Sequence, residues 1–365
     1  METLTTMNGR AEKKIRRGYG RHSEMEREKQ RTKWEEGVRQ WKTLIQNMTA
    51  VKKMKEVLEE KRKVKKENTK NTQHDEWFGD KLNISKEWPK KTKENTVRIY
   101  GHNVNGVSCA QNYSEWEIML EHLNDRQIDI ACLTEINLDI EKSDVKFALY
   151  EKAKRLDKGM NITLTASKDG KHDRINKRGG IITMTRGNWS GRIINSGSEK
   201  MGRWTYVTLQ GKKNRKLTIY TIYRACNQKH QEGTCTIYMQ QEQELIKAGR
   251  KDTDPREAIL ADLTMQIQKD TQKDHDIIVI GDVNEDLYNN KRIEQFLADN
   301  NLYNVIKEKH KGNGPATYDR GTKCLDLVAA TNTIDPEAIQ KCGYFPFYEG
   351  ILSDHRASYI DIRAD

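Results

Sequence analysis

Two polar side chains stand at the end of an apolar run in IIVIGDVNED, residues 277–286. The run stops at a glycine and Asp282, and Asn284 follows two positions later. In an extended chain these two side chains point to the same side. A carboxylate beside an amide could hold and deprotonate a water molecule while contacting a metal or a phosphoryl oxygen. A turn that caps a strand would use the same residue types.

Three other stretches, TEIN, CLDL and SDH, add acids and a histidine. Glu135 follows a buried run, and carboxylates are the usual ligands of Mg²⁺. Asp326 lies inside an apolar strand, where an unpaired charge would be costly. His355 could donate a ring N–H to it, which would leave the neighbouring Asp354 free to face a metal. A surface glutamate and a structural Asp–His pair are the alternative interpretations.

Two more strand ends carry polar side chains. HNVNG supplies Asn103 and Asn105, and LTIYTIYRACN supplies Tyr223, Arg224 and Asn227. Each of these residues is unremarkable by itself, since a tyrosine at such a position is usually packed or hydrogen-bonded. They gain interest only because they recur at the ends of predicted strands, where α/β folds place their sites.

The elements that must position these residues begin near Thr96. The predicted strands cover residues 97–103, 128–135, 179–185, 204–209, 217–223, 277–282, 324–330 and 358–362. Helical patterns cover residues 114–125, 144–155, 255–272 and 291–300. Strands separated sometimes by helices and sometimes only by turns indicate sheets packed face to face with helices outside. We therefore expect one α/β domain over residues 96–365.

The first quarter of the chain differs in charge. Residues 1–95 carry 26 Lys and Arg against 16 Asp and Glu, whereas the remaining residues carry 39 against 38. A detached basic segment is typical of an electrostatic grip on a polyanion, although solubility alone would also explain it. We take residues 1–95 as a basic, largely helical extension with a linker.

Within this extension, residues 23–67 favour a helix. Trp34, Val38, Trp41, Ile45 and Met48 form one narrow apolar stripe along it. The stripe could make a coiled coil that self-associates through residues 30–60, dock on the following domain, or lie along nucleic acid. Residues 68–95 lose this periodicity and are interpreted as a linker.

Targeting and redox signals are sparse. The six cysteines at 109, 132, 226, 235, 324 and 342 include no Cys-x-x-Cys pair, so a zinc site is not expected. Cys132 and Cys324 are expected to be core residues in a reducing compartment. No apolar run is long enough to cross a bilayer, so membrane insertion is not expected. The basic runs 13–17 and 61–66 resemble nuclear import signals, and we expect an intracellular protein in the nucleus or cytoplasm.

The motifs follow one order along the chain: HNVNG, TE, YRACN, GDVNED, TYDRGTKCLD and SDH. In that order they resemble the endonuclease/exonuclease/phosphatase superfamily, which includes exonuclease III-type abasic-site endonucleases, pancreatic-type DNases and non-LTR retrotransposon endonuclease domains. The resemblance spans about residues 97–363. It implies a four-layer α/β sandwich of two packed mixed sheets flanked by helices, and Mg²⁺-dependent cleavage of phosphate esters, with Mn²⁺ as a substitute.

The resemblance also implies a metal site. Glu135 matches the superfamily's principal metal-binding glutamate. Asn103 matches the asparagine that helps to order the metal site, and Asp354 matches a further acidic residue of that site. Asn105 stands where abasic-site enzymes often have aspartate, a difference that retrotransposon endonucleases tolerate.

Five further residues match catalytic positions. Asp282 matches the aspartate that activates water, and Asn284 matches the asparagine that positions the phosphate and orients that aspartate. His355 matches the histidine that contacts the scissile phosphate, with Asp326 as its orienting partner. Tyr223 resembles the tyrosine that steadies the phosphoryl group.

Besides Asn105, the chain departs from the superfamily pattern in three places, one of which is Leu327, where a tyrosine commonly follows the aspartate. YRACN is one residue longer than the usual Tyr-x-Pro-Asn and lacks its proline, and the usual Thr-Trp is Thr317-Tyr318 here. None of the core acid, amide or histidine positions is lost, which favours an active enzyme. Substrate contacts are expected from Asn105, Asn227, Arg224 and Thr317.

We therefore expect a Mg²⁺-dependent DNA endonuclease of the retrotransposon or abasic-site type, acting on double-stranded DNA and leaving 3′-hydroxyl and 5′-phosphate ends. Two alternatives stay open. One is a phosphoinositide or sphingomyelin phosphodiesterase of the same fold, with the basic extension at a membrane surface. The other is an inactive nucleic-acid-binding relative.

Overall fold

The structure is a computed structural model that describes residues 24–68, 91, 95–140, 142–166, 177–227, 236–348 and 351–363. The chain divides into two compact units, residues 1–53 and 54–365. Within the first unit the described residues belong to the helix α2, Glu24–Asn68, which continues into the second unit. The predicted domain boundary near residue 96 stays a prediction. The fold described below is that of the second unit.

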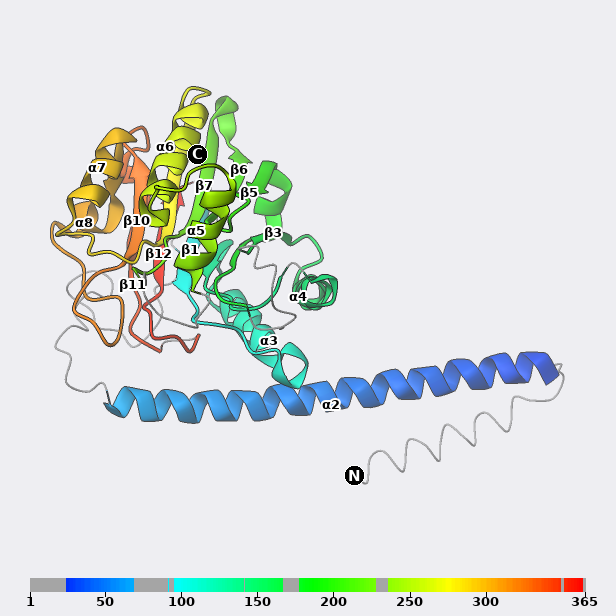
Figure 1. The fold of residues 1–365 in the computed structure, drawn as a ribbon. Helices are drawn as coiled ribbons and strands as arrows, with labels where there is room; N and C mark the ends of the chain where they lie inside the picture. Colours follow the sequence, from blue (N-terminus) through cyan, green and yellow to red (C-terminus); the bar gives the residue numbers. More distant parts are fainter. Residues whose placement is uncertain are drawn as a thin grey trace. The chain divides into compact units, whose positions relative to one another are not determined.

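Twelve strands form two six-stranded sheets in the described part of this unit (Figure 1). The first sheet has the order β11-β12-β1-β2-β4-β3. Its strands are β1 Thr96–Asn103, β2 Ile130–Thr134, β3 Asn161–Thr165, β4 Ile181–Thr185, β11 Ile339–Tyr344 and β12 Ser358–Arg363. The second sheet has the order β5-β6-β7-β8-β10-β9. Its strands are β5 Ile193–Ser198, β6 Trp204–Gln210, β7 Lys216–Tyr223, β8 His275–Asp282, β9 Leu302–Asn304 and β10 Asp326–Thr331.

The two sheets share one pattern of strand directions. In the first sheet β1 and β2 are parallel, and every other neighbouring pair is antiparallel. In the second sheet β7 and β8 are the parallel pair, again with antiparallel neighbours on both sides. Each sheet therefore has one central parallel pair, and the carboxyl ends of that pair meet at one edge of the sheet.

Helices cover the outer faces of both sheets. They are α3 Ala110–Asp125, α4 Ser143–Leu156, α5 Ile237–Lys247, α6 Pro255–Thr271, α7 Lys291–Asp299 and α8 Val305–His310, with short 3₁₀ turns η2 Gly187–Arg192, η3 Lys212–Asn214 and η4 Pro336–Ala338. Residues of α3 and α4 pack with the first sheet, and residues of α6, α7 and α8 pack with the second. The predicted four-layer α/β sandwich is confirmed (Figure 1).

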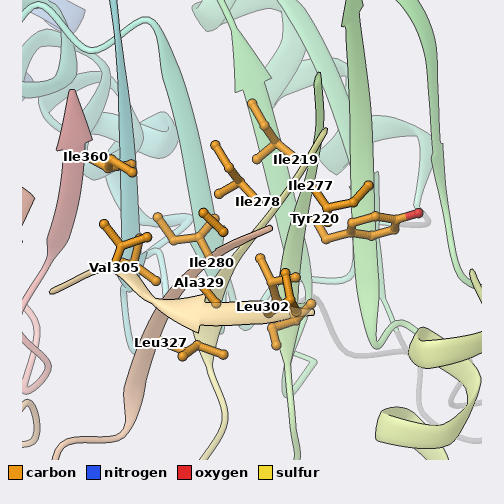
Figure 2. Packing of buried hydrophobic residues seen from close by; sticks show 14 of the residues in the cluster. Ile219, Tyr220, Ile277, Ile278, Ile280, Leu302, Val305, Leu327, Ala329 and Ile360 are labelled. Atoms are coloured by element: carbon orange, nitrogen blue, oxygen red, sulfur yellow. The ribbon is translucent and has the colours of Figure 1, made fainter. Parts of the chain in front are cut away.

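The core between the sheets is made of side chains from both. Figure 2 shows Ile219 of β7, Ile278 of β8 and Ile360 of β12 within one cluster, and each is fully buried. Burying a side chain of this size stabilises the fold by about 1.5–3 kcal/mol. A hydrogen-bonded pair of threonines joins the sheets elsewhere, because the hydroxyl of Thr183 in β4 lies 2.6 Å from that of Thr221 in β7. Apolar packing and a satisfied polar contact thus fix how the sheets stack.

Two glycines permit close approach near the ends of the central strands. A Cβ on Gly101 of β1 would lie 2.6 Å from the Ile280 side chain of β8, so the glycine lets the two sheets meet there. Gly281 has a φ of +146°, and a Cβ there would overlap the carbonyl oxygen of Ile222 in the adjacent strand. Any larger residue at 281 would displace Asp282, which follows it.

All eight predicted strands and all four predicted helices of residues 96–365 are present, and so is the predicted helix in the basic extension. Sequence reasoning missed β3, β5, β9, β11, α5 and α8. The sequence of β5, IINSGS, is largely exposed and rich in turn-forming residues, and β9 has only three residues. Neither gives a periodic apolar signal.

Several predictions concern parts of the chain that only partly belong to the described residues. The linker interpretation of residues 68–95 and the import-like run 13–17 lie almost wholly outside them. So do the side chains of Trp34, Trp41 and Ile45, so the use of the apolar stripe stays a prediction. Cys132 and Cys324 are buried free thiols, as expected. Among the described helices, none is both long and apolar enough to span a membrane.

Candidate active site

The two central parallel pairs deliver four polar side chains to one region. In the first sheet β1 ends at Asn103, which is paired in register with Thr134, the residue before Glu135. In the second sheet β7 ends at Tyr223 and β8 ends at Asp282, and these two are paired in register. The sheets meet through Asn103, whose amide Nδ2 donates a hydrogen bond of 2.9 Å to Asp282 Oδ2.

Asp282 is enclosed by hydrogen-bond donors. Its side chain is fully buried, and besides the bond from Asn103 it accepts two from Asn284, a backbone bond of 2.7 Å to Oδ1 and a side-chain bond of 3.1 Å to Oδ2. Burial raises the pKa of Asp282 to about 7, against the lowering effect of the His355 charge. The carboxyl group is thus held in one orientation and binds its proton more tightly than an exposed aspartate does.

Asn284 is itself fixed at every polar atom. Its Nδ2 also donates a hydrogen bond of 2.8 Å to the backbone carbonyl of Arg224, and its Oδ1 accepts from the Cys226 thiol, with 2.9 Å between sulfur and oxygen. Asn284 adopts a left-handed backbone conformation with φ +48°, which asparagine tolerates well. The strand therefore turns immediately after Asp282 and folds the amide back onto the carboxylate.

Asp326 and His355 form the predicted pair. Asp326 begins β10, where it is in antiparallel register with Asp282, so it lies at a strand end and not inside the strand as the sequence suggested. His355 Nδ1 lies 3.0 Å from Asp326 Oδ2, and its Nε2 lies 4.0 Å from Asp282 Oδ2. Burial acts to lower the pKa of His355, but the neighbouring carboxylates, Asp326 first among them, raise it to about 10. The imidazole is therefore held cationic beside Asp282.

Two buried residues hold this pair in place. The Thr317 hydroxyl accepts hydrogen bonds of 2.8 Å and 3.2 Å from the backbone N–H groups of Leu325 and Asp326. His102 Nε2 lies 3.1 Å from the backbone carbonyl of His355, and burial lowers the pKa of His102 to about 4, so it stays neutral. Both residues act on the backbone around the pair.

Glu135 is placed more openly. It is half-buried, its backbone is left-handed with φ +53°, and the Tyr223 hydroxyl donates a hydrogen bond to Oε1. A left-handed conformation of a residue other than Gly, Asn or Asp costs on the order of 1 kcal/mol and is often retained at functional positions. Burial raises the pKa of Glu135, with the hydrogen bond from Tyr223 as the largest opposing cause.

Glu135 and Tyr223 line a cavity of about 470 Å³. The other lining residues are Asn105, Asn137, Arg178, Gly179, Cys226, Ile237, Tyr238 and Arg320. Arg178 and Arg320 are exposed, and both contribute positive charge to a cavity that also contains a carboxylate. A carboxylate can hold a divalent cation, and arginines beside it attract an anion. The cavity therefore suits an anionic ligand that also contacts a bound cation.

The sequence predicts that Asp354 is free to face a metal, but in the structure Asp354 is paired. Its side chain is buried, and Oδ2 accepts a hydrogen bond of 2.8 Å from Arg320 Nη2. Oδ1 is also buried and forms no hydrogen bond with the described residues. A carboxylate oxygen left without a donor inside a protein is costly unless a ligand satisfies it.

The residues present fit a hard divalent cation. Glu135 and Asp354 offer oxygen ligands, which Mg²⁺ prefers, and the unpaired Oδ1 of Asp354 is an available one. Asp282, Asp326 and His355 also bring one ligand atom each to within 4.8 Å of one another. In that second group the Asp326–His355 hydrogen bond and the three donors on Asp282 already engage the candidate ligand atoms. Asp354 is connected to the cavity of Glu135 through Arg320, which lines that cavity and is bonded to Asp354.

The structure corrects two of the predicted substrate contacts. Arg224 is fully buried, and its Nε donates 2.9 Å to the carbonyl of Arg256 while Nη1 donates 3.2 Å to Glu285. Thr317 is also fully buried. Neither side chain can reach a ligand, because the first braces the backbone behind Asn284 and the second caps the start of β10.

Asn105 and Asn227 remain candidates for substrate contact. Asn105 is exposed and lines the cavity, and its backbone N–H donates a hydrogen bond of 3.0 Å to Asn103 Oδ1. Asn227 is exposed and is the last described residue before a gap. Arg178, which follows a gap in the described residues, also lines the cavity.

Sequence reasoning missed Cys226, Arg320 and Asn137. Asn137 follows Glu135 by two residues, just as Asn284 follows Asp282. This repeated acid-x-Asn pattern could have identified Asn137 as a candidate site residue. Cys226 and Arg320 lie inside the quoted stretches YRACN and TYDRGTKCLD, but nothing in their spacing indicates a contact with Asn284 or Asp354.

The sequence matches no protein-family profile and no curated protein. Among solved structures, it is similar to the AP endonuclease LMAP from Leishmania major, with 12% identity, coverage of 74% of this chain and 89% of that chain, and a TM-score of 0.55. It also matches the APE2 catalytic domain from Xenopus laevis, with 14% identity, 73% and 92% coverage, and a TM-score of 0.49.

A third match is the endonuclease domain of TRAS1, a telomere-specific non-LTR retrotransposon, with 12% identity, 74% and 99% coverage, and a TM-score of 0.46. The fold assignment rests on the first of the three, which has the highest TM-score among them. The described strands and helices of the second unit thus have a fold similar to that of an AP endonuclease, and this is the fold that the resemblance in sequence implied.

Proposed function

We propose that this chain hydrolyses phosphodiester bonds of nucleic acid with the help of a divalent cation, most specifically as a DNA endonuclease of the abasic-site or retrotransposon type. The observation that carries the proposal is the hydrogen bond between Asn103 and Asp282, because it joins the two sheets where each presents a carboxylate. The second support is the fold, which is that of an AP endonuclease.

In this proposal Asp282 is the general base. Its carboxyl group is oriented by Asn103 and Asn284, and burial raises its pKa to about 7, near the pH at which it would work. It would accept the proton of a water molecule that attacks phosphorus, while the bond between phosphorus and the 3′ oxygen breaks and that oxygen takes up a proton from solvent. A fixed base with a matched pKa contributes about 10²–10⁴-fold to the rate.

His355 is the proposed electrostatic partner of the phosphate. Asp326 fixes the ring through Nδ1 and keeps it cationic, so Nε2 can donate to a non-bridging phosphate oxygen. Glu135 and Asp354 would hold Mg²⁺, or Mn²⁺ in its place. A bound cation would supply positive charge where the phosphate oxygens gain negative charge. Tyr223 keeps the Glu135 carboxylate in position.

The substrate is proposed to be double-stranded DNA, cut to leave 3′-hydroxyl and 5′-phosphate ends. The cavity beside Glu135 carries two exposed arginines, and residues 1–95 hold 26 of the 65 basic residues of the chain. Lys and Arg side chains that pair with phosphates make binding salt-dependent. A nuclear location and self-association through residues 30–60 belong to the same proposal, with the basic extension gripping DNA.

The test is a nicking assay on supercoiled plasmid with Mg²⁺ or with EDTA. We expect the wild type to convert plasmid to the open circle only with Mg²⁺, and His355→Ala and Glu135→Ala to fail. His275→Ala is the matched control, because His275 begins β8 whereas Asp282 ends it. Release of lipid headgroups from phosphoinositide or sphingomyelin vesicles, without nicking, would favour the lipid phosphodiesterase alternative. Activity indifferent to EDTA and to both variants would exclude the metal-dependent mechanism.

A further inference from the structure

Arg320 has an unusual setting for an exposed arginine. Its side chain is 70% exposed, yet its Nη2 is bonded at 2.8 Å to Asp354, whose side chain is only 8% exposed. The guanidinium also lies 5.1 Å from the ring centroid of Tyr318 and 3.5 Å, through Nε, from Asp319. One surface cation thus neutralises a carboxylate that belongs to the candidate metal site.

The backbone explains why Arg320 is beside Asp354. Tyr318 forms a bridge with His355, and the N–H of Asp319 donates a hydrogen bond of 2.9 Å to the carbonyl of Asp354. The rings of Tyr318 and His355 lie 5.2 Å apart. Residues 317–319 therefore run alongside the segment that carries the candidate catalytic histidine, and the next residue must project near Asp354.

Only half of Asp354 is satisfied by this contact. Arg320 engages Oδ2, whereas Oδ1 is buried and forms no hydrogen bond within the described part of the chain. An arginine is a large planar cation whose charge is spread over the guanidinium, and it leaves the inner oxygen unpaired here. A small divalent cation would satisfy that oxygen better.

The Arg320 side chain can also adopt a second position, in the cavity. It lines the 470 Å³ cavity together with Glu135 and Tyr223, and most of its side chain is in solvent. Rotation of the long side chain away from Asp354 would keep the charge at the cavity and leave the guanidinium free to bind a phosphate with two parallel hydrogen bonds. The guanidinium end of this ion pair is exposed, so it can exchange its contact with Asp354 for contacts with water or with a phosphate.

We infer that Arg320 is the counter-ion of Asp354 in the cation-free protein and that a divalent cation displaces it toward the phosphate of the substrate. The inference rests on the proposed function, since it concerns the same site. Cation binding and phosphate binding are then coupled: each ligand favours the arrangement that the other requires. Arg320 acts both as a competitor of the cation and as a contact for a phosphate of the nucleic acid.

The first measurement is the dissociation constant of Mn²⁺, by calorimetry on the full chain without nucleic acid. Arg320→Gln removes the competitor, so we expect Mn²⁺ to bind about 3- to 10-fold more tightly, as for the loss of an ion pair that opposes it. Arg178→Gln is the matched control, because Arg178 lines the same cavity whereas Arg320 forms the ion pair with Asp354. It should leave the Mn²⁺ affinity unchanged.

The second measurement is the affinity for a duplex oligonucleotide, by fluorescence anisotropy in the Asp282→Asn background to prevent cleavage. Mg²⁺ should raise this affinity, and Arg320→Gln should reduce the gain about 3- to 10-fold, which is the coupling that Arg320 carries. Arg178→Gln should weaken binding with and without Mg²⁺ by the same factor.

The inference would be overturned if Arg320→Gln bound Mn²⁺ as well as the wild type or more weakly, at an unaltered melting temperature. The proposed function would remain intact in that case, provided that the wild type still nicks DNA. The inference would also be overturned if Arg178→Gln raised the Mn²⁺ affinity as much as Arg320→Gln does. The change in affinity would then come from the total positive charge around the cavity. A wild type that binds no Mn²⁺ and nicks no plasmid would remove the proposed function and the inference together.

Discussion

The two sheets have the same arrangement of strands but use it differently. In each, the second strand of the central parallel pair runs into an acid followed two residues later by asparagine: Glu135 and Asn137 in the first sheet, Asp282 and Asn284 in the second. Asn284 bonds to its own acid at 3.1 Å. Asn137 instead accepts a hydrogen bond of 2.8 Å from the backbone of Gly179 and leaves Glu135 to the cavity.

This difference assigns different chemistry to two similar motifs. Asp282 is fully buried and receives three amide hydrogen bonds, which suits a proton acceptor that must not move. Glu135 is half-buried and lines the cavity, where the Tyr223 hydroxyl donates to it, which suits a ligand that must open to a cation. The surroundings of an acid, more than its place in the topology, set what it can do.

The largest expected effect comes from replacing Asp282, the proposed general base. Asp282→Asn should lower the nicking rate by about 10³-fold, within the range for a lost general base. Because burial raises the pKa of Asp282 to about 7, the wild-type rate should rise as the pH increases toward neutrality, and this rise should vanish in the variant. Asp299→Asn, at the exposed end of α7, is the control. A variant that keeps the rise would show that another group takes the proton.

The corresponding experiment in the first sheet replaces Glu135. Glu135→Gln should weaken Mn²⁺ binding and lower the nicking rate on the order of 100-fold, since a metal site contributes several kcal/mol to such reactions. Added Mn²⁺ should restore part of the rate, which it should not do for Asp282→Asn. If calorimetry finds the metal defect in Asp282→Asn and not in Glu135→Gln, the two roles are reversed.

A smaller effect is expected from disturbing the strand that ends in Asp282. Gly281→Ala introduces a Cβ against the carbonyl oxygen of Ile222 at a φ of +146°, so it should destabilise the fold by about 2–3 kcal/mol. Urea unfolding followed by circular dichroism measures this. Gly191→Ala, which has no atom within 4 Å of the new Cβ, should change the stability by less than about 0.5 kcal/mol. Equal costs at both positions would contradict the requirement for glycine at 281.

The smallest effect tests the enclosure of Asp282. Cys226→Ala removes the donor to Asn284 Oδ1 and should lower kcat about twofold to fivefold, with KM unchanged, because a neutral hydrogen bond contributes about 1 kcal/mol. Cys226→Ser keeps a donor and should retain most of the rate. Burial raises the pKa of the Cys226 thiol to about 12, so it remains a donor at neutral pH. Equal kcat for all three proteins would mean that Asn284 needs no such support.

The sequence predicted the fold well where local pattern decides. The buried runs of β7 and β8 are continuous and β-branched, and the helices α6 and α7 begin with Asp254 and Asn290 as caps. It could not predict Arg320 beside Asp354, since that contact depends on how residues 317–319 pair with 354–356. The prediction that Arg224 contacts substrate was also wrong, since Arg224 is buried. The sequence does not indicate whether a charged residue next to a site faces the ligand or the core.

The hydrogen bond from Asn103 to Asp282 crosses from one sheet to the other, so the site exists only while the layers stay stacked. Denaturant that loosens the stacking should separate Asp282, the proposed proton acceptor, from Glu135, the proposed cation ligand, before any strand or helix is lost. The proposed hydrolysis should therefore report on the interlayer contact, and its rate should fall at a lower urea concentration than the far-ultraviolet circular dichroism of the chain.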